Sequence, residues 1–169
     1  EIITALPKDR LSPESTSQKE GFIHPVNIQG QVENAQIDLI IRDFEDEKLK
    51  EHEEEVKNIV IKILENYPDA SVEFKITEQY RNMKKVIDHY PKISEFALKA
   101  IERAGIKPLK RSIRGGTDGS RLSFMGLPCP NIFAGEHAFH GKQEWVSEQD
   151  MQAAVRTIVN LAMIWEEES

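Results

Sequence analysis

The sequence predicts an α/β protein in two parts, and the spacing of its apolar residues provides the observations behind this prediction. Residues 22 to 78 combine segments of alternating apolar residues with one helical stripe, which predicts an α+β arrangement: an antiparallel sheet covered by a helix. Residues 91 to 169 combine two longer helical stripes with short extended segments, which is typical of an α/β arrangement. The two parts are therefore expected to be built differently.

A β-hairpin is predicted first. The segment 22–28 is extended in character and is followed by a turn around Gly30. The next segment has an apolar residue at every second position: Ile37, Leu39 and Ile41. A period of two indicates a strand with one buried face, so Arg42 is expected on the face opposite these residues.

A helix and a third strand follow the predicted hairpin. The helix runs from about Asp46 to Asn66, and Pro68 ends it. Its apolar residues, three, four and seven positions apart, form one stripe: Leu49, Val56, Ile59, Val60, Ile63 and Leu64. Alternation then returns at Val72, Phe74 and Ile76, which predicts a further strand.

Two helices are predicted in the second part. One starts near Pro91, because proline suits a first helical position, and it stops at Gly105, a usual C-terminal cap. The last helix begins after Ser147, with Asp150 completing an acidic variant of a capping box. The apolar stripe expected to form its core face is Met151, Ala154, Val155, Ile158, Val159 and Ala162.

Composition excludes several classes of protein. The 169 residues carry a formal net charge of -7, which argues against a nucleic-acid-binding protein because phosphate contacts need a basic surface. No apolar run approaches the roughly 18 residues that a membrane span requires. The single cysteine, Cys129, suits a reducing compartment, and the first residues lack the basic start of a signal peptide. These features predict a cytoplasmic protein.

The glycine-rich segment 113–121, IRGGTDGSR, is the strongest local motif. Glycines allow backbone N–H groups to surround an anion, and an arginine can bind a carboxylate or phosphate with two hydrogen bonds. The same residues also fit a turn that begins a helix, with Asp118 as its cap. Both interpretations remain open, but the segment does not match the phosphate loop of nucleotide triphosphatases.

A second motif contains two histidines, His137 and His140, with carboxylates nearby. Imidazole nitrogens and carboxylate oxygens are zinc ligands, and flanking glycines suit a loop that brings a histidine to a metal. The alternative is a surface loop without a ligand role, because a zinc site needs more ligands than this loop supplies. The other histidines, including His52 in the acidic helix, are expected to be structural or solvated.

Taken together, five stretches resemble the peptidase T family, the tripeptide aminopeptidases among the co-catalytic dizinc exopeptidases. Three of these stretches are short: GFIH at 21–24, IIRDFEDEKL at 40–49 and YRNMKKVI at 80–87. The two most specific are SIRGGTDGSRLSFMGLPCPNIFAG at 112–135 and FHGKQEW at 139–145. The resemblance extends over essentially the whole chain.

This resemblance implies a function and a division into domains. Residues 1–79 resemble the later part of the lid or dimerisation domain, and residues 80–169 resemble the C-terminal segment of the catalytic metallopeptidase domain. The family releases the N-terminal residue of tripeptides with water activated by two zinc ions. Among its ligands, only His140 matches a residue of this chain, and no catalytic residue matches. The resemblance therefore implies that the isolated chain is inactive.

The resemblance also implies substrate-binding residues. Arg42 matches the lid arginine that relatives use to hold a substrate carboxylate. The segment that lines the substrate cleft corresponds to Arg114, Gly115, Gly116, Thr117, Asp118 and Gly119. Where the family usually has an aromatic residue, this chain has His137, which is therefore not expected to be a zinc ligand. A homodimer formed through the lid domain is also implied. Two alternatives to the enzyme are a non-catalytic dimerisation module and an anion-binding α/β module.

Overall fold

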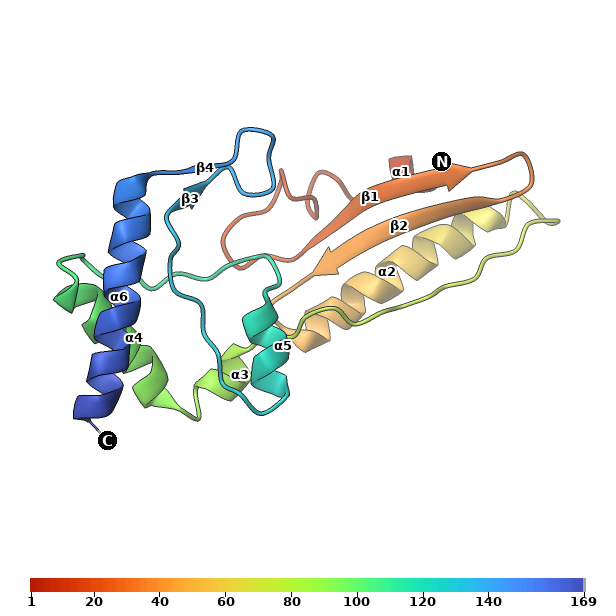
Figure 1. The fold of residues 1–169 in the computed structure, drawn as a ribbon. Coiled ribbons are helices and arrows are strands. Elements are labelled where there is room, and N and C mark those ends of the chain that lie inside the picture. The colour runs from red at the N-terminus through yellow and green to blue at the C-terminus, as the bar shows by residue number, and fades with distance from the viewer. Residues whose placement is uncertain (169) are drawn as a thin grey trace. The chain divides into compact units, whose positions relative to one another are not determined.

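The computed structural model describes residues 1–168, which divide into two units (Figure 1). The first unit contains residues 1–79 together with residues 112–115. The second unit contains residues 80–111 and the described chain from residue 116 onward. Helices are combined with small antiparallel sheets, which confirms the predicted α/β class. Within residues 1–168, no helix has the length and apolar character needed to cross a membrane.

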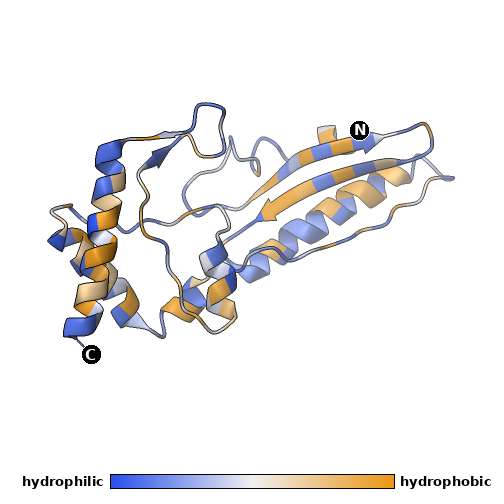
Figure 2. Cartoon of the chain, viewed as in Figure 1, coloured by the Kyte–Doolittle hydropathy of each residue, from blue (hydrophilic) through white to orange (hydrophobic). Residues whose placement is uncertain are grey.

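The first unit is built on the predicted hairpin. Strand β1 (Phe22–Gly30) pairs antiparallel with β2 (Ala35–Arg42), and the register places Phe22 opposite Arg42. The register shifts between Pro25 and Asn27, where proline cannot donate a backbone hydrogen bond to the ladder. Figure 2 shows the alternation of polar and apolar residues along both strands.

Helix α2 (Asp46–Leu64) supplies the second layer of this unit, as predicted. It lies along β2 in Figure 1 and presents Val56 and Val60, one turn apart, to the core. A short helix, α1 (Ile2–Ala5), also contacts it. The core consists of four buried residues from the α1 region, β1 and α2: Leu6, Ile23, Val56 and Val60. Leu39 and Ile41 pack against this core, which confirms the predicted buried face of the second strand for these two residues; Ile37 is half-buried and lies outside the core cluster.

The third strand predicted for this unit is wrong. Residues 71–79 belong to neither of the two sheets, and each of Val72, Phe74 and Ile76 is exposed. Alternation shows which face of a segment could be buried, but a strand also needs a neighbour with which to form a backbone ladder. No strand within residues 1–168 forms a backbone ladder with residues 71–79, so the sheet of this unit has two strands.

Helices dominate the second unit. Helix α4 (Pro91–Arg103) starts with proline at a first helical position, and Gly105, with a φ of +80°, follows its end as predicted. A short helix, α3 (Lys84–Ile87), precedes α4. Three elements complete the unit before the last helix: α5 (Asp118–Phe124), β3 (Glu136–His137) and β4 (Trp145–Val146).

The last helix, α6 (Glu148–Glu167), begins where predicted. The Ser147 hydroxyl accepts a hydrogen bond from the Asp150 N–H at 3.0 Å, and it donates to the Asp150 carboxylate at 2.6 Å. The cap is therefore confirmed. In a full capping box the acidic side chain would instead accept from the backbone of the cap residue.

The face of α6 that forms the core is not the predicted one. Helix α6 packs on α4 through Leu161 and the buried Ile164, which contact Phe96 and Ala100. Thr157 is buried too, and its hydroxyl is satisfied by the Ala153 carbonyl at 3.0 Å. The predicted stripe lies on another face and is largely exposed at its large residues: Met151, Val155, Ile158 and Val159. Periodicity located this apolar stripe, but the position of α4 decides which face is buried.

Candidate substrate-binding and metal-ligand residues

Arg42 is the last residue of β2 and stands opposite Phe22 in the hairpin. Its two terminal nitrogens donate hydrogen bonds, one to the Gln79 side-chain oxygen at 2.6 Å and one to the Ile41 carbonyl at 3.2 Å. The side chain of Ile41 packs on the core, so strand alternation places Arg42 on the other face. We call this end of the hairpin, defined by Phe22 and Arg42, the hairpin end.

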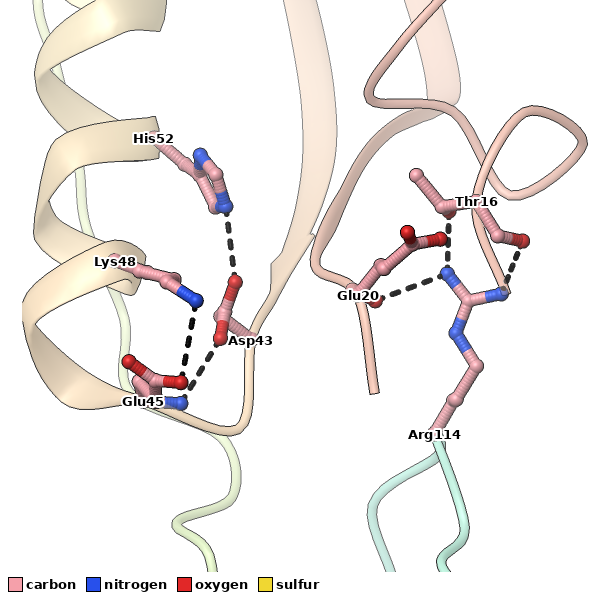
Figure 3. A network of polar contacts seen from close by, with 7 residues as sticks. All are labelled: Thr16, Glu20, Asp43, Glu45, Lys48, His52 and Arg114. Carbon is pink, nitrogen blue, oxygen red and sulfur yellow. Dashed lines mark hydrogen bonds and ion pairs between the residues drawn. The ribbon is translucent and has the colours of Figure 1, made fainter. Parts of the chain in front are cut away.

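A buried carboxylate follows Arg42 immediately. One Asp43 oxygen accepts a hydrogen bond from the Glu45 N–H at 2.9 Å, and the other lies 3.0 Å from Nε2 of His52. The side chains of Asp43 and His52 are only 3% and 12% exposed. Figure 3 shows Asp43 beside Glu45, which precedes α2, and His52, which lies further along the same helix. The pair thus joins the end of β2 to α2.

Arg114 lies at the hairpin end as well, through contacts within the first unit. Its terminal nitrogens donate to the carbonyl and hydroxyl of Thr16, at 2.9 and 2.5 Å, and to the carbonyl of Glu20 at 3.2 Å (Figure 3). Its guanidinium carbon also lies 4.9 Å from the centre of the Phe22 ring. The remaining nitrogen, Nε, is buried without a hydrogen-bond partner. Arg114 therefore holds the segment 16–20 in place in this structure.

The structure brings the two predicted substrate-binding arginines together through one residue. Phe22 pairs with Arg42 along the backbone and contacts Arg114 through its ring. Their guanidinium groups have different partners. The Arg42 guanidinium contacts the Gln79 side chain and the Ile41 carbonyl, whereas that of Arg114 contacts the loop 16–20. To bind a carboxylate with its terminal nitrogens, Arg114 would have to release Thr16 and Glu20.

The glycine-rich segment begins a helix, which is one of the two interpretations left open by the sequence. Asp118 is the first residue of α5, and Thr117, not Asp118, occupies the cap position. The Thr117 hydroxyl makes no cap hydrogen bond and instead accepts one from the Asn131 side chain at 3.1 Å. A side chain at Gly116 would place its Cβ 1.9 Å from the Tyr80 ring, whereas Gly115 has open space. Close approach of an aromatic ring is thus the reason for glycine at 116.

His140 lies in the loop that joins β3 to β4 and is exposed. Its φ is +60°, in the left-handed region that non-glycine residues seldom adopt. The turn is closed by a hydrogen bond from the Gly141 N–H to the Ala138 carbonyl at 2.9 Å. At the base of the loop, the His137 ring stacks on Trp145 with ring centres 4.4 Å apart and planes 12° apart. His137 thus supports the loop by packing.

Within residues 1–168, no group of three or more His, Cys, Asp or Glu side chains comes together in a way that could hold a metal ion. An imidazole is a suitable zinc ligand, but a site needs three or four protein ligands. The residues described here therefore do not form a zinc site by themselves, and His140 is at most one member of one.

Sequence reasoning missed the Asp43–His52 contact and the Gln79 partner of Arg42. Of the two roles that the sequence predicts for His52, structural or solvated, its burial against Asp43 supports the structural one. A signal was available, since an aspartate can accept the backbone N–H of the residue two positions later, which here is the cap residue Glu45 of α2. Nothing in the sequence alone marks which histidine of the helix reaches it.

Comparison with known proteins gives a consistent result. No family model matches the chain. A protein named Peptidase T from Clostridium perfringens (strain SM101) is 43% identical over 167 residues, which cover 99% of this chain and 41% of the relative. Peptidase T from Clostridium botulinum (strain Okra) is 43% identical over 97% of this chain and 40% of the relative. Peptidase T from Shewanella sediminis is 45% identical over 93% of this chain and 38% of the relative. The chain is therefore a homologue of peptidase T that spans about two fifths of the length of these relatives.

Proposed function

We propose that this chain is the C-terminal portion of a tripeptide aminopeptidase, a hydrolase that releases the N-terminal residue of tripeptides. One observation carries the proposal: identity of 43% to relatives named Peptidase T across 99% of the chain. Because the chain spans 41% of that relative, the activity is proposed for a longer protein and the isolated chain is expected to be inactive. In this proposal the chain supplies substrate-binding residues and one metal ligand.

Arg42 is the residue proposed to hold the substrate carboxylate. A guanidinium presents its N–H groups in a planar fork that matches the two oxygens of a carboxylate. The Gln79 side chain accepts from one terminal nitrogen of Arg42 at 2.6 Å and so helps to orient the guanidinium. A hydrogen bond from a guanidinium to a carboxylate is charge-assisted, and it is therefore stronger than one to a neutral acceptor.

Arg114 and the segment 115–119 are proposed to line the substrate cleft. Arg114 contributes in the proposal mainly by fixing the 16–20 segment, because its terminal nitrogens already donate to Thr16 and Glu20. Gly116 presents backbone without a side chain, and its neighbour Tyr80 prevents any larger residue from replacing it. Thr117 and Asp118 would face peptide from the start of α5.

The proposed enzyme is a metallo-aminopeptidase that uses zinc, and His140 is the ligand proposed within this chain. Its imidazole stands in an exposed loop with a left-handed backbone, and strain of this kind is concentrated at functional sites. The remaining ligands would have to come from the part of the longer protein outside this chain, since residues 1–168 offer no complete donor set. A bound zinc would supply Lewis-acid chemistry.

We also propose a cytoplasmic location and a homodimer formed through residues 1–79, with tripeptides as the small-molecule partner. The single cysteine and the absence of a disulfide framework support a reducing compartment. Both strands of this two-stranded sheet are edge strands, and edge strands can pair with another chain, which supports association.

The test is tripeptide hydrolysis by the full-length protein, with and without a chelator, beside a His140→Ala variant. We expect chelator-sensitive release of the N-terminal residue and a loss of roughly hundredfold or more in the variant, because removing a ligand weakens both metal binding and activity. His89→Ala is the matched control, since that histidine is exposed and lies outside the loop, and it should leave the rate unchanged. Full activity of His140→Ala would refute the ligand role. No hydrolysis by the zinc-loaded full-length protein would refute the enzyme.

A further inference from the structure

We propose that Asp43 and His52 are positioning residues for Arg42: the pair fixes the chain next to the arginine so that its guanidinium is presented in one orientation. This inference rests on the proposed role of Arg42 in binding the substrate carboxylate. It assigns a function to a buried ionisable pair for which the proposed reaction has no other use.

The first step of the argument is that both oxygens of Asp43 are engaged. One accepts from the Glu45 N–H at 2.9 Å, and the other contacts His52 Nε2 at 3.0 Å. Because the carboxylate is 3% exposed, water does not compete for these contacts. The peptide that joins Arg42 to Asp43 is thereby tied to α2 at two points, a backbone group and a side chain.

The second step is that the residue before β1, Gly21, packs closely against the Asp43–His52 pair and the Arg42 backbone. Gly21 directly precedes Phe22, the partner of Arg42 in the ladder. A Cβ built at Gly21 would lie 2.2 Å from an Asp43 oxygen, 2.7 Å from the Arg42 carbonyl and 2.7 Å from His52 Nε2. Only glycine permits this approach, so residue 21, the pair and the arginine backbone form one packed unit.

The third step concerns the guanidinium itself. With the backbone of Arg42 fixed by the pair, the Gln79 oxygen at 2.6 Å holds the far end of the side chain. An arginine held at both ends loses less conformational freedom when a carboxylate binds, which favours affinity. A pair that only stabilised the start of α2 would have no such effect on substrate binding.

The experiment compares tripeptide hydrolysis by the full-length protein and by its variants, with each substrate as the free acid and as the C-terminal amide. For His52→Leu we expect KM for the free acid to rise about tenfold with kcat within about twofold, as for loss of a binding contact equal in ground and transition states. The amide substrate, which lacks the carboxylate, should show no change. For His52→Gln we expect a KM close to the wild-type value, because the glutamine amide can donate a hydrogen bond to Asp43.

Two further variants make the test specific. In an Arg42→Ala background, His52→Leu should add nothing, since residues that act through one another give non-additive effects. Gly21→Ala keeps both side chains but crowds the pair, and it should reproduce the rise in KM. The matched control is Lys48→Gln, on the same helix, where an exposed ion pair with Glu45 at 3.2 Å is removed and no change is expected.

The outcomes separate this inference from the proposed function. Equal rises in KM for acid and amide, or full additivity with Arg42→Ala, would overturn the positioning role while leaving the peptidase intact. If the wild-type protein hydrolyses no tripeptide, the proposed function fails. The positioning role is then tested by NMR on the 169-residue chain labelled with ¹⁵N-arginine. There, His52→Leu should broaden or shift the Arg42 Nε–H signal with helix content unchanged, and an unaltered signal would overturn the inference.

Discussion

Replacing Ile164 with alanine tests which face of α6 forms the core. Ile164 is 1% exposed and packs among Phe96, Ala100 and Leu161. The change removes three buried methyl or methylene groups at about 0.8 kcal/mol each, roughly 2.4 kcal/mol in all. The cavity adds about 1 kcal/mol, and the better helix propensity of alanine returns about 0.4 kcal/mol. We therefore expect the free energy of unfolding to fall by about 3 kcal/mol.

Ile158→Ala is the matched control on the same helix. Ile158 belongs to the predicted stripe but is 54% exposed, so only about half of the 2.4 kcal/mol transfer term is lost. Solvent fills the space, so no cavity term applies, and helix propensity again returns about 0.4 kcal/mol. The expected loss is about 0.7 kcal/mol.

The assay is urea unfolding of the 169-residue chain, followed by far-UV circular dichroism. Linear extrapolation gives the free energy of unfolding, and an unchanged m-value ensures that the denatured state is the same for both variants. A loss at Ile158 equal to or greater than that at Ile164 would refute the packing of α6 described here. It would show that the apolar stripe seen in the sequence, and not the face on α4, is the buried one.

Three further changes are predicted to follow from local geometry. Gly116→Ala should destabilise the chain by about 1–3 kcal/mol because an aromatic ring occupies the space, whereas Gly115→Ala, in open space, should change stability by less than about 0.5 kcal/mol; similar urea midpoints for both would contradict this. Ser147→Ala should cost about 1 kcal/mol through loss of the cap on α6, and thermal unfolding at or above the wild-type midpoint would argue against the cap. The hydrogen bond from Arg103 lowers the pKa of Glu167 below its ordinary 4.5, so this pair stabilises the fold above pH 4.5 and ceases to do so as the pH falls through the folded-state pKa. Glu167→Gln should therefore reduce the acid dependence of stability, which pH-dependent urea unfolding measures; an unaltered profile would exclude the contribution.

The elements of the fold that could be predicted are those whose signals are local. Pro91 and Gly105 mark the ends of α4 through backbone chemistry that acts within a few residues, and Ser147 does the same for α6. The hairpin follows from an extended segment and an alternating segment joined by a short turn. Residues 71–79 have the same alternation, but whether a strand forms depends on a neighbour that sequence cannot supply.

The candidate site could likewise be predicted only in part. Arg42 and His140 were identified by resemblance, since an arginine after a strand or a histidine in a loop is common in any protein. The partners of Arg114 were beyond prediction because Thr16 and Glu20 are 98 and 94 residues away. The contact of Asp43 with His52, only nine residues apart, was missed for another reason. Its formation depends on the angle between β2 and α2, which the chain sets through the core.

The extended segment 71–79 has a consequence for handling the protein. Proteases bind their substrates as exposed, extended chain, and structure without a backbone ladder requires little local unfolding before it fits such a cleft. Lys75 lies in the middle of this exposed segment. Trypsin should therefore cut after Lys75 before it cuts at lysines within α2 such as Lys57 and Lys62.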